Sequence, residues 1–230
     1  MLMTRRHELH ALEQAVRAEL DAAHRARETA LAACRRTIRA CGNAIRATHR
    51  RETELAAILG DEAATALGEA HRALEPYPTL AAAGPLHDAE KEYAEARLTA
   101  ALVDDGALAS HLDLGVSAAA WLNGLAEAAS ELRRHLLDRL RDGDLPRGEA
   151  LLGVMGDVYD TLVTIDFPDA VTGGLRRTTD ALRAVLERTR GDLTTTLLQA
   201  RLQAAIEARI PPGSVPGPEG GVSSGDPTGV

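Results

Sequence analysis

The stretch LHALEQAVRAELDAAHRARETALAACRRTIRACGNAI, residues 9–45, decides the fold class of this 230-residue chain. Its apolar residues recur every three or four positions, except where Arg27 interrupts the pattern. They are Leu9, Leu12, Val16, Leu20, Ala23, Leu31, Cys34, Ile38, Cys41 and Ile45. This spacing places them on one face of an α-helix. We therefore predict a long N-terminal amphipathic helix.

Proline and glycine divide the rest of the chain into further helices. A second helix is predicted from about Asp61, as its N-cap, to the Glu75-Pro76-Tyr77-Pro78 break. The remaining predicted helices cover residues 87–103, 116–141, a segment from after Pro146 to about 165, and 175–206, with a break at 191–192 as an alternative. No run of residues alternates long enough to form a strand. The sequence predicts an all-α fold of six or seven helices.

Two glycines fall inside the helix that ends near Ile165. Gly153 and Gly156 lower helix stability, so we predict that they mark close contact with a neighbouring helix.

The composition changes only near the C-terminus. A single domain over residues 1–210 is the default for a chain of this length. From Pro211 onward the residues are mainly Pro, Gly and Ser, which bury too little surface to offset the entropy cost of ordering. We predict a disordered tail over residues 211–230.

The formal net charge of -8 excludes a protein that holds nucleic acid by overall attraction, so any basic surface must be local. Lys91 is the only lysine among 26 basic residues. That bias fits a GC-rich or salt-adapted genome at least as well as selection of arginine for phosphate. Lys91 therefore receives no functional role from the sequence.

The cysteines and the first residues predict the compartment. Cys34 and Cys41 are seven residues apart on one helix, about 10 Å, which is too far for a disulfide within the chain. The N-terminus is charged and no apolar run follows it, so neither a signal peptide nor a membrane span is predicted. We expect a cytoplasmic protein that does not bind membranes.

Two pairs of glutamates lie on single faces of two predicted helices. Glu92 and Glu95 are three residues apart, and Glu127 and Glu131 are four apart. Four carboxylates at one point would bind Mg²⁺ or Mn²⁺, because hard divalent cations prefer oxygen ligands. Such spacing is also common on solvated helix faces of acidic proteins, and spacing alone does not separate the two interpretations.

A basic stripe follows one face of the first helix. Arg35, Arg39, Arg46 and Arg50 recur at steps of four, seven and four. The stripe can follow a phosphate backbone, or it can be a solvated face paired with neighbouring acids. With five aromatic residues in the chain, base stacking is a poor source of affinity.

Three segments agree in order and separation with one known family. They are KEYAEA (residues 91–96), GLAEAASELRR (124–134) and GLRRTTDALR (174–183), with a weaker match in RRTIR (35–39) and HRR (49–51). Together they resemble the translin family, and most closely its archaeal translin-associated factor X type. The resemblance is best over residues 86–210, and the tail lies outside it.

The resemblance implies a translin-like helical bundle that assembles into a hollow homo-octamer enclosing RNA or single-stranded DNA. It also implies a metal-dependent endoribonuclease in the factor X branch and a non-catalytic protein in translin proper. The catalytic, metal-binding carboxylates of that branch, with Mg²⁺ or Mn²⁺ as the cofactor, map to Glu92, Glu95, Glu127 and Glu131. The candidates for contacts to the nucleic-acid backbone are Arg35, Arg39, Arg46, Arg50 and Arg97.

One position departs from the pattern of the branch, which usually has Asp where this chain has Glu127. The added methylene moves the carboxylate by about 1.5 Å, and active sites tolerate little displacement. The implied reaction is hydrolysis of RNA by a metal-activated water, with the acids as ligands. A non-catalytic RNA-binding scaffold and a helical interaction protein without nucleic acid are the alternatives.

Overall fold

The computed structural model describes residues 2–82 and 84–209, which form helices and loops without a strand. Nine helices lie in these residues, six long ones and three of four residues each. They are α1 (Leu2–His49), α2 (Thr53–Leu74), α3 (Pro78–Ala81), α4 (Gly84–Val103), α5 (His111–Leu114), α6 (Ala118–Arg141), α7 (Leu145–Val163), α8 (Asp169–Thr172) and α9 (Leu175–Glu207). The predicted all-α fold is confirmed. The three short helices lie between the helices that the sequence predicted.

The chain divides into two compact units, Met1–Leu193 and Thr194–Val230. Helices α1 to α8 belong to the first unit, together with the part of α9 that ends at Leu193. The predicted disordered tail, residues 211–230, lies outside the described residues.

The predicted start of the second helix is wrong. α2 begins at Thr53, about two turns before Asp61. Asp61 therefore lies inside the helix, where its carboxylate accepts a hydrogen bond from Arg97 at 3.2 Å. An aspartate caps a helix only when the helix begins immediately after it.

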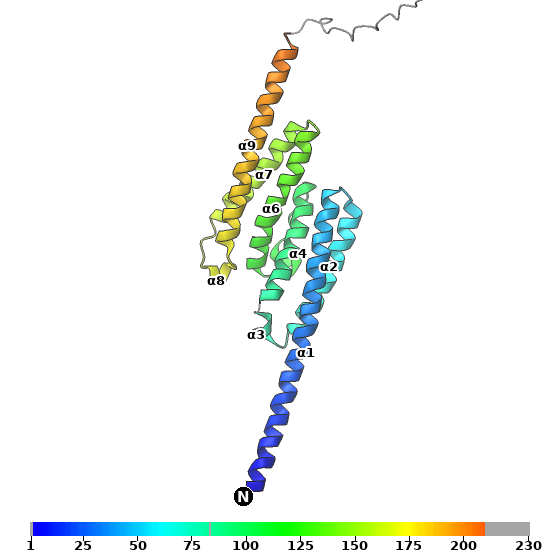
Figure 1. Ribbon diagram of the computed structural model, residues 1–230, viewed down its shortest axis with the longest axis vertical. Coiled ribbons are helices and arrows are strands. Elements are labelled where there is room, and N and C mark those ends of the chain that lie inside the picture. Colours follow the sequence, from blue (N-terminus) through cyan, green and yellow to red (C-terminus); the bar gives the residue numbers. More distant parts are fainter. Residues whose placement is uncertain (1, 83, 210–230) are drawn as a thin grey trace, which may run out of the picture. The chain divides into compact units, whose positions relative to one another are not determined.

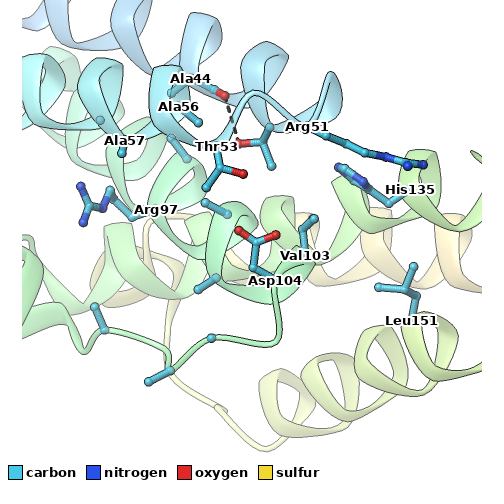
Figure 2. A pocket seen from close by; sticks show the side chains of 18 of the residues that line it. Ala44, Arg51, Thr53, Ala56, Ala57, Arg97, Val103, Asp104, His135 and Leu151 are labelled. Atoms are coloured by element: carbon cyan, nitrogen blue, oxygen red, sulfur yellow. Dashed lines mark hydrogen bonds between the residues drawn. The ribbon is translucent and has the colours of Figure 1, made fainter. Parts of the chain in front are cut away.

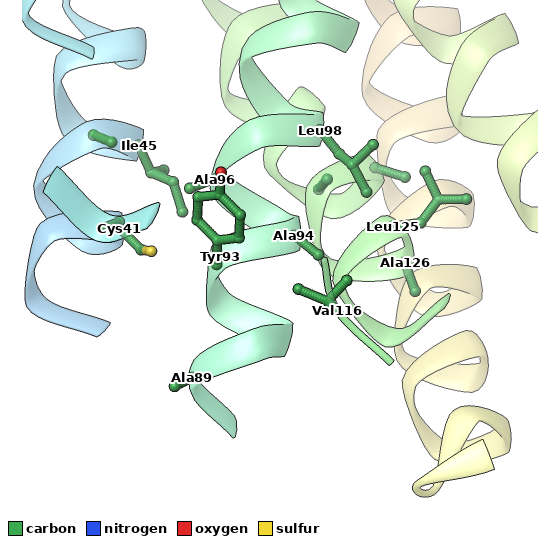
Figure 3. Close-up of a cluster of buried hydrophobic side chains, with 14 of the residues drawn as sticks. Cys41, Ile45, Ala89, Tyr93, Ala94, Ala96, Leu98, Val116, Leu125 and Ala126 are labelled. Carbon is green, nitrogen blue, oxygen red and sulfur yellow. The ribbon is translucent and has the colours of Figure 1, made fainter. Parts of the chain in front are cut away.

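Within the first unit, α1 packs against α2 and α4, α4 packs against α6, and α6 packs against α7 (Figure 1). Figure 3 shows Tyr93 of α4 on the side of Cys41 and Ile45, which belong to α1. Leu98 lies on the opposite side of α4, toward Leu125 of α6. α4 is thus buried on two sides, which brings residues of both α1 and α6 close to it.

α4 and α6 approach closely at Gly124. A Cβ atom at this position would lie 2.8 Å from the Cβ of Ala94, 2.8 Å from the backbone oxygen of Lys91 and 2.9 Å from the backbone nitrogen of Glu95. Only glycine fits against this turn of α4 without a shift of the backbone. The close contact predicted at Gly153 and Gly156 is wrong, because nothing among the described residues lies within 4 Å of a Cβ at either position.

A buried carboxylate joins α4 to the start of α6. Glu90 is 8% exposed and accepts hydrogen bonds from His71 at 2.8 Å and from the backbone nitrogen and hydroxyl of Ser117 at 3.0 and 2.7 Å. Ser117 is the N-cap of α6. Burial works to raise the pKa of Glu90, but these hydrogen bonds outweigh burial and hold the pKa below its usual value. The ionised side chain fixes α6 relative to α4.

The amphipathic face predicted for α1 is buried only in the second half of the helix. From Ala30 onward it contributes to the core, as at Ala33 and Cys41. Leu9, Leu12, Val16 and Leu20 are 57 to 64% exposed. In the described part of the chain, no helix is long and apolar enough to cross a membrane.

Replacing Gly124 with alanine should lower the free energy of unfolding by about 1–3 kcal/mol, because the added methyl group overpacks the α4–α6 contact. Urea denaturation measures this change. Gly153→Ala is the matched control, since that site is open and alanine favours a helix by up to about 1 kcal/mol. Equal stability of the wild-type and Gly124→Ala proteins would show that the contact is not tight.

Replacing Glu90 with glutamine should destabilise the protein by about 1–3 kcal/mol at pH 7, because the donors of Ser117 and His71 lose a charged acceptor. The folded-state pKa lies below the unfolded value of about 4.3, so the stabilisation is complete above that value. It disappears as the pH falls through the folded-state pKa. Denaturation curves for both proteins between pH 7 and pH 3 should therefore converge at the acidic end.

Glu62→Gln, at an exposed position on α2, is the control for Glu90→Gln and should stay within about 0.5 kcal/mol of wild type. A difference between wild type and Glu90→Gln that does not shrink toward pH 3 would contradict the role given to the ionised carboxylate.

Candidate metal centre

Three of the four predicted carboxylates come together between α4 and α6. One oxygen from each of Glu92, Glu95 and Glu127 lies within 4.8 Å of the other two. Glu95 directly follows Ala94 and Glu92 precedes it by two residues, while Glu127 is one turn after Gly124 on α6. The tight contact between Ala94 and Gly124 thus sets the distance between the carboxylates.

The negative charges in this cluster are crowded. Glu95 is 9% exposed. Burial, the charges of Glu127 and Glu92, and a hydrogen bond with Glu127 raise the pKa of Glu95 to about 9. A cation bound among the three carboxylates would relieve this repulsion.

Lys91 supplies a positive charge within the cluster. Its Nζ donates to both carboxylate oxygens of Glu127, at 2.8 and 2.7 Å, and lies 3.4 Å from an oxygen of Glu92. No role was predicted for this lysine from the sequence. The signal that could have indicated one is its position immediately before Glu92, as the only lysine in the chain.

Glu131 lies one turn beyond Glu127 and is held by His49, which in turn contacts His135. Nε2 of His49 donates to Glu131 at 2.7 Å, and Nδ1 of His49 is 3.0 Å from Nε2 of His135. The hydrogen bond from His49 lowers the pKa of Glu131. Burial and the neighbouring His49 lower the pKa of His135 to about 4, so His135 is neutral at pH 7. Glu131 adds to the negative potential at Glu95.

The sequence did not assign roles to these two histidines. His135 follows Glu131 by four residues, on the same face of α6, which is the local signal. His49 comes from α1, 82 residues away from Glu131, so only the fold reveals this contact.

The four arginines of the predicted stripe are all exposed: Arg35, Arg39 and Arg46 lie on α1, and Arg50 directly follows its last residue, His49. Arg46 lies three residues before His49, so the stripe begins beside the histidine that holds Glu131. Arg50 also pairs with Glu52 at 2.7 Å.

Arg97 lines a separate cleft of about 730 Å³. Figure 2 shows Arg97 and Asp104 on one part of its wall and Arg51 with His135 on another. Arg97 pairs with Asp61 across this cleft region at 3.2 Å. The structure thus places Arg97 beside an acid and in the cleft, and because it follows Glu95 by two residues on α4 it does not share a helix face with Glu95.

The donor set fits a hard divalent cation. Mg²⁺ and Mn²⁺ prefer oxygen ligands, and a site with one or two carboxylates and bound water is typical of Mg²⁺. Glu92, Glu95 and Glu127 offer such oxygens from two rigid helices. The partial exposure of Glu92 and Glu127 leaves room for water or a phosphate oxygen.

Comparisons with known proteins agree on one relationship. No model of a known protein family matches the chain. The structure of AfC3PO bound to duplex RNA is 31% identical, with 84% of this chain and 98% of that chain covered and a TM-score of 0.73. AfC3PO alone is 33% identical, with 84% and 99% covered and the same TM-score.

Two more distant proteins are also similar. The structure of apo-NeC3PO is 17% identical, covers 80% of this chain and 96% of its own, and has a TM-score of 0.72, so it shows a shared fold. An uncharacterized protein of Methanocaldococcus jannaschii is 28% identical over 186 residues, 79% of this chain and 81% of its own length.

The C3PO structures are translin-family proteins, and the identity to AfC3PO exceeds 30% over almost the whole of that chain. The resemblance found in the sequence is therefore confirmed, and this chain belongs to the translin family.

Proposed function

We propose that this chain is an RNA-binding, metal-dependent endoribonuclease that hydrolyses phosphodiester bonds inside a homo-oligomeric shell. The observation that carries the proposal is the convergence of Glu92, Glu95 and Glu127 within 4.8 Å in a translin-family fold. RNA as the ligand is supported by AfC3PO, whose structure contains duplex RNA.

Glu92, Glu95 and Glu127 would hold Mg²⁺ or Mn²⁺, which supplies a Lewis acid for the phosphate and a hydroxide for in-line attack. The residues of the chain act as ligands and orient the site. The α4–α6 contact keeps the carboxylates in place, and burial of Glu95 keeps water away from one side of the cluster. Glu131, fixed by His49, adds negative charge at the edge of the site.

The exposed stripe on α1 would bind the RNA backbone. Arg46 precedes His49 by one turn, so a strand that follows the stripe leads toward Glu131 and the cluster. Four arginines on one face give the local positive charge that a chain with a net charge of -8 needs to hold RNA. Arg97 is a further candidate for binding the RNA backbone. Asp61 pairs with Arg97 and would compete with a phosphate for its charge.

Two parts of the proposal rest on family membership alone. We expect a homo-octamer of the 24.4 kDa chain, with single-stranded DNA as a second ligand. The cytoplasm as the location rests on the sequence pattern alone. Size-exclusion chromatography with light scattering tests the octamer.

A non-catalytic RNA-binding scaffold is the second candidate, and one observation favours it. Lys91 binds both oxygens of Glu127 and so compensates part of the charge of the cluster without a metal. Tight RNA binding without cleavage under any divalent ion would select this candidate.

Replacing Glu95 with glutamine should lower Mg²⁺-dependent RNA cleavage at least about a hundredfold, because the amide keeps the shape of the side chain but cannot release a proton to become a charged ligand. Affinity for RNA should stay unchanged. Cleavage of end-labelled single-stranded and duplex RNA, with Mg²⁺ and with EDTA, measures the first effect, and a binding titration measures the second.

Glu54→Gln, an exposed substitution on α2, is the control for Glu95→Gln and should cut at the wild-type rate. Full cleavage by the Glu95→Gln protein would contradict the site, and cleavage in EDTA would contradict the requirement for a metal.

Replacing both Arg39 and Arg46 with alanine should weaken RNA binding and lower the slope of log affinity against log salt by about one per arginine. Titrations at several salt concentrations give the slope. Arg17→Ala, which removes an exposed arginine paired with Glu13, is the control and should leave the slope unchanged. An unchanged slope in the double variant would place the RNA elsewhere.

A further inference from the structure

Lys91 binds the carboxylate of Glu127, which a metal bound to the cluster would also need as a ligand. Its side chain begins on α4, immediately before Glu92, and crosses to Glu127 on α6. Both contacts to Glu127 are short, at 2.8 and 2.7 Å, and the ammonium is also 3.4 Å from Glu92. The ammonium therefore touches two of the three carboxylates that form the cluster.

We propose that Lys91 is a tethered counter-cation that competes with the divalent metal for Glu127 and thereby sets the metal affinity of the site. This inference rests on the proposed function, because it requires that the cluster binds a metal. Lys91 would oppose metal binding, whereas Glu92, Glu95 and Glu127 would hold the ion.

Charge repulsion makes the two cations exclude each other. A metal coordinated by Glu92 and Glu127 would lie a few ångström from an ammonium held by the same two side chains, and like charges at that distance repel strongly in a partly buried site. Lysine is a compact charge on a flexible four-carbon stem, so it can leave Glu127 without movement of either helix. Exchange of ammonium for metal needs only rotation of a side chain.

The cluster still favours a divalent ion after Lys91 is counted. One ammonium touches two carboxylates in a cluster of three, so it cannot compensate the mutual repulsion of all three when they are ionised. A doubly charged ion relieves more of this repulsion than a single ammonium does. Metal binding should therefore be possible but weaker than the three carboxylates alone would give.

The test compares metal binding by the wild-type protein and by Lys91→Met, without RNA, using isothermal titration calorimetry with Mn²⁺ and Mg²⁺. A bidentate, charge-assisted pair corresponds to a tenfold or larger factor in affinity, so Lys91→Met should bind metal at least about tenfold more tightly. Lys91→Arg keeps the charge and should stay close to wild type. Thermal melts show whether each variant is folded.

Arg36→Met is the matched control, because it also replaces a basic residue by methionine and breaks an ion pair, with Glu69, that joins α1 to α2. It should leave metal affinity unchanged. If folded Lys91→Met binds metal no more tightly than wild type, the inference about Lys91 is overturned. If wild type binds metal and Glu95→Gln does not, the proposed metal site still stands. No binding by either wild type or Lys91→Met overturns both.

A second measurement uses the wild-type protein and needs no substitution. Because Lys91 is the only lysine, acetylation with an amine-reactive reagent reports on this side chain, with the N-terminal amine as an internal reference. Displacement by Mn²⁺ should raise the acetylation rate of Lys91, measured by mass spectrometry, relative to that reference. A rate that does not respond to metal at saturating concentration overturns the inference.

Discussion

The close approach of α4 and α6 at Gly124 is the contact on which the candidate site depends. Gly124 packs against the α4 turn between Lys91 and Glu95, so the backbones of the two helices come nearer than side chains would allow. Glu127 follows one turn later and faces Glu92 and Glu95. A larger residue at position 124 would separate the helices and the carboxylates together. The same contact between α4 and α6 therefore packs the apolar core and forms the polar site.

Bringing acids together costs free energy, and the surrounding residues show how it is offset. Burial and repulsion raise the pKa of Glu95 to about 9, which is the cost of placing it beside Glu127 and Glu92. Lys91 compensates Glu127, and His49 holds Glu131 in its ionised form. These two positive or donating groups reach the acids from different helices. The site is thus stable enough to form and still carries excess negative charge, which is the condition for binding a cation.

The sequence predicted the parts of the site that depend on one helix at a time. Helical periodicity placed Glu92 with Glu95, and Glu127 with Glu131, on single faces. It could not predict how α4 and α6 rotate against each other, because that depends on which glycine is at the crossing. The sequence predicted close contact at Gly153 and Gly156, which lie in open positions, whereas the enclosed glycine is Gly124. The contact of His49 with Glu131 could not be predicted from the sequence either, because it joins residues 82 positions apart.

The structure offers a physical explanation for Glu127, the position at which the sequence departs from the related branch. Glu127 is longer than the aspartate of the related branch, yet its carboxylate reaches Glu92 and Glu95 and also accepts both bonds from Lys91. Two long side chains, one from each helix, meet between α4 and α6. A shorter acid at position 127 would sit about 1.5 Å farther back and hold the ammonium less closely. The extra methylene and the lysine are therefore best understood as a pair, because each gives the other a partner within the gap between the helices.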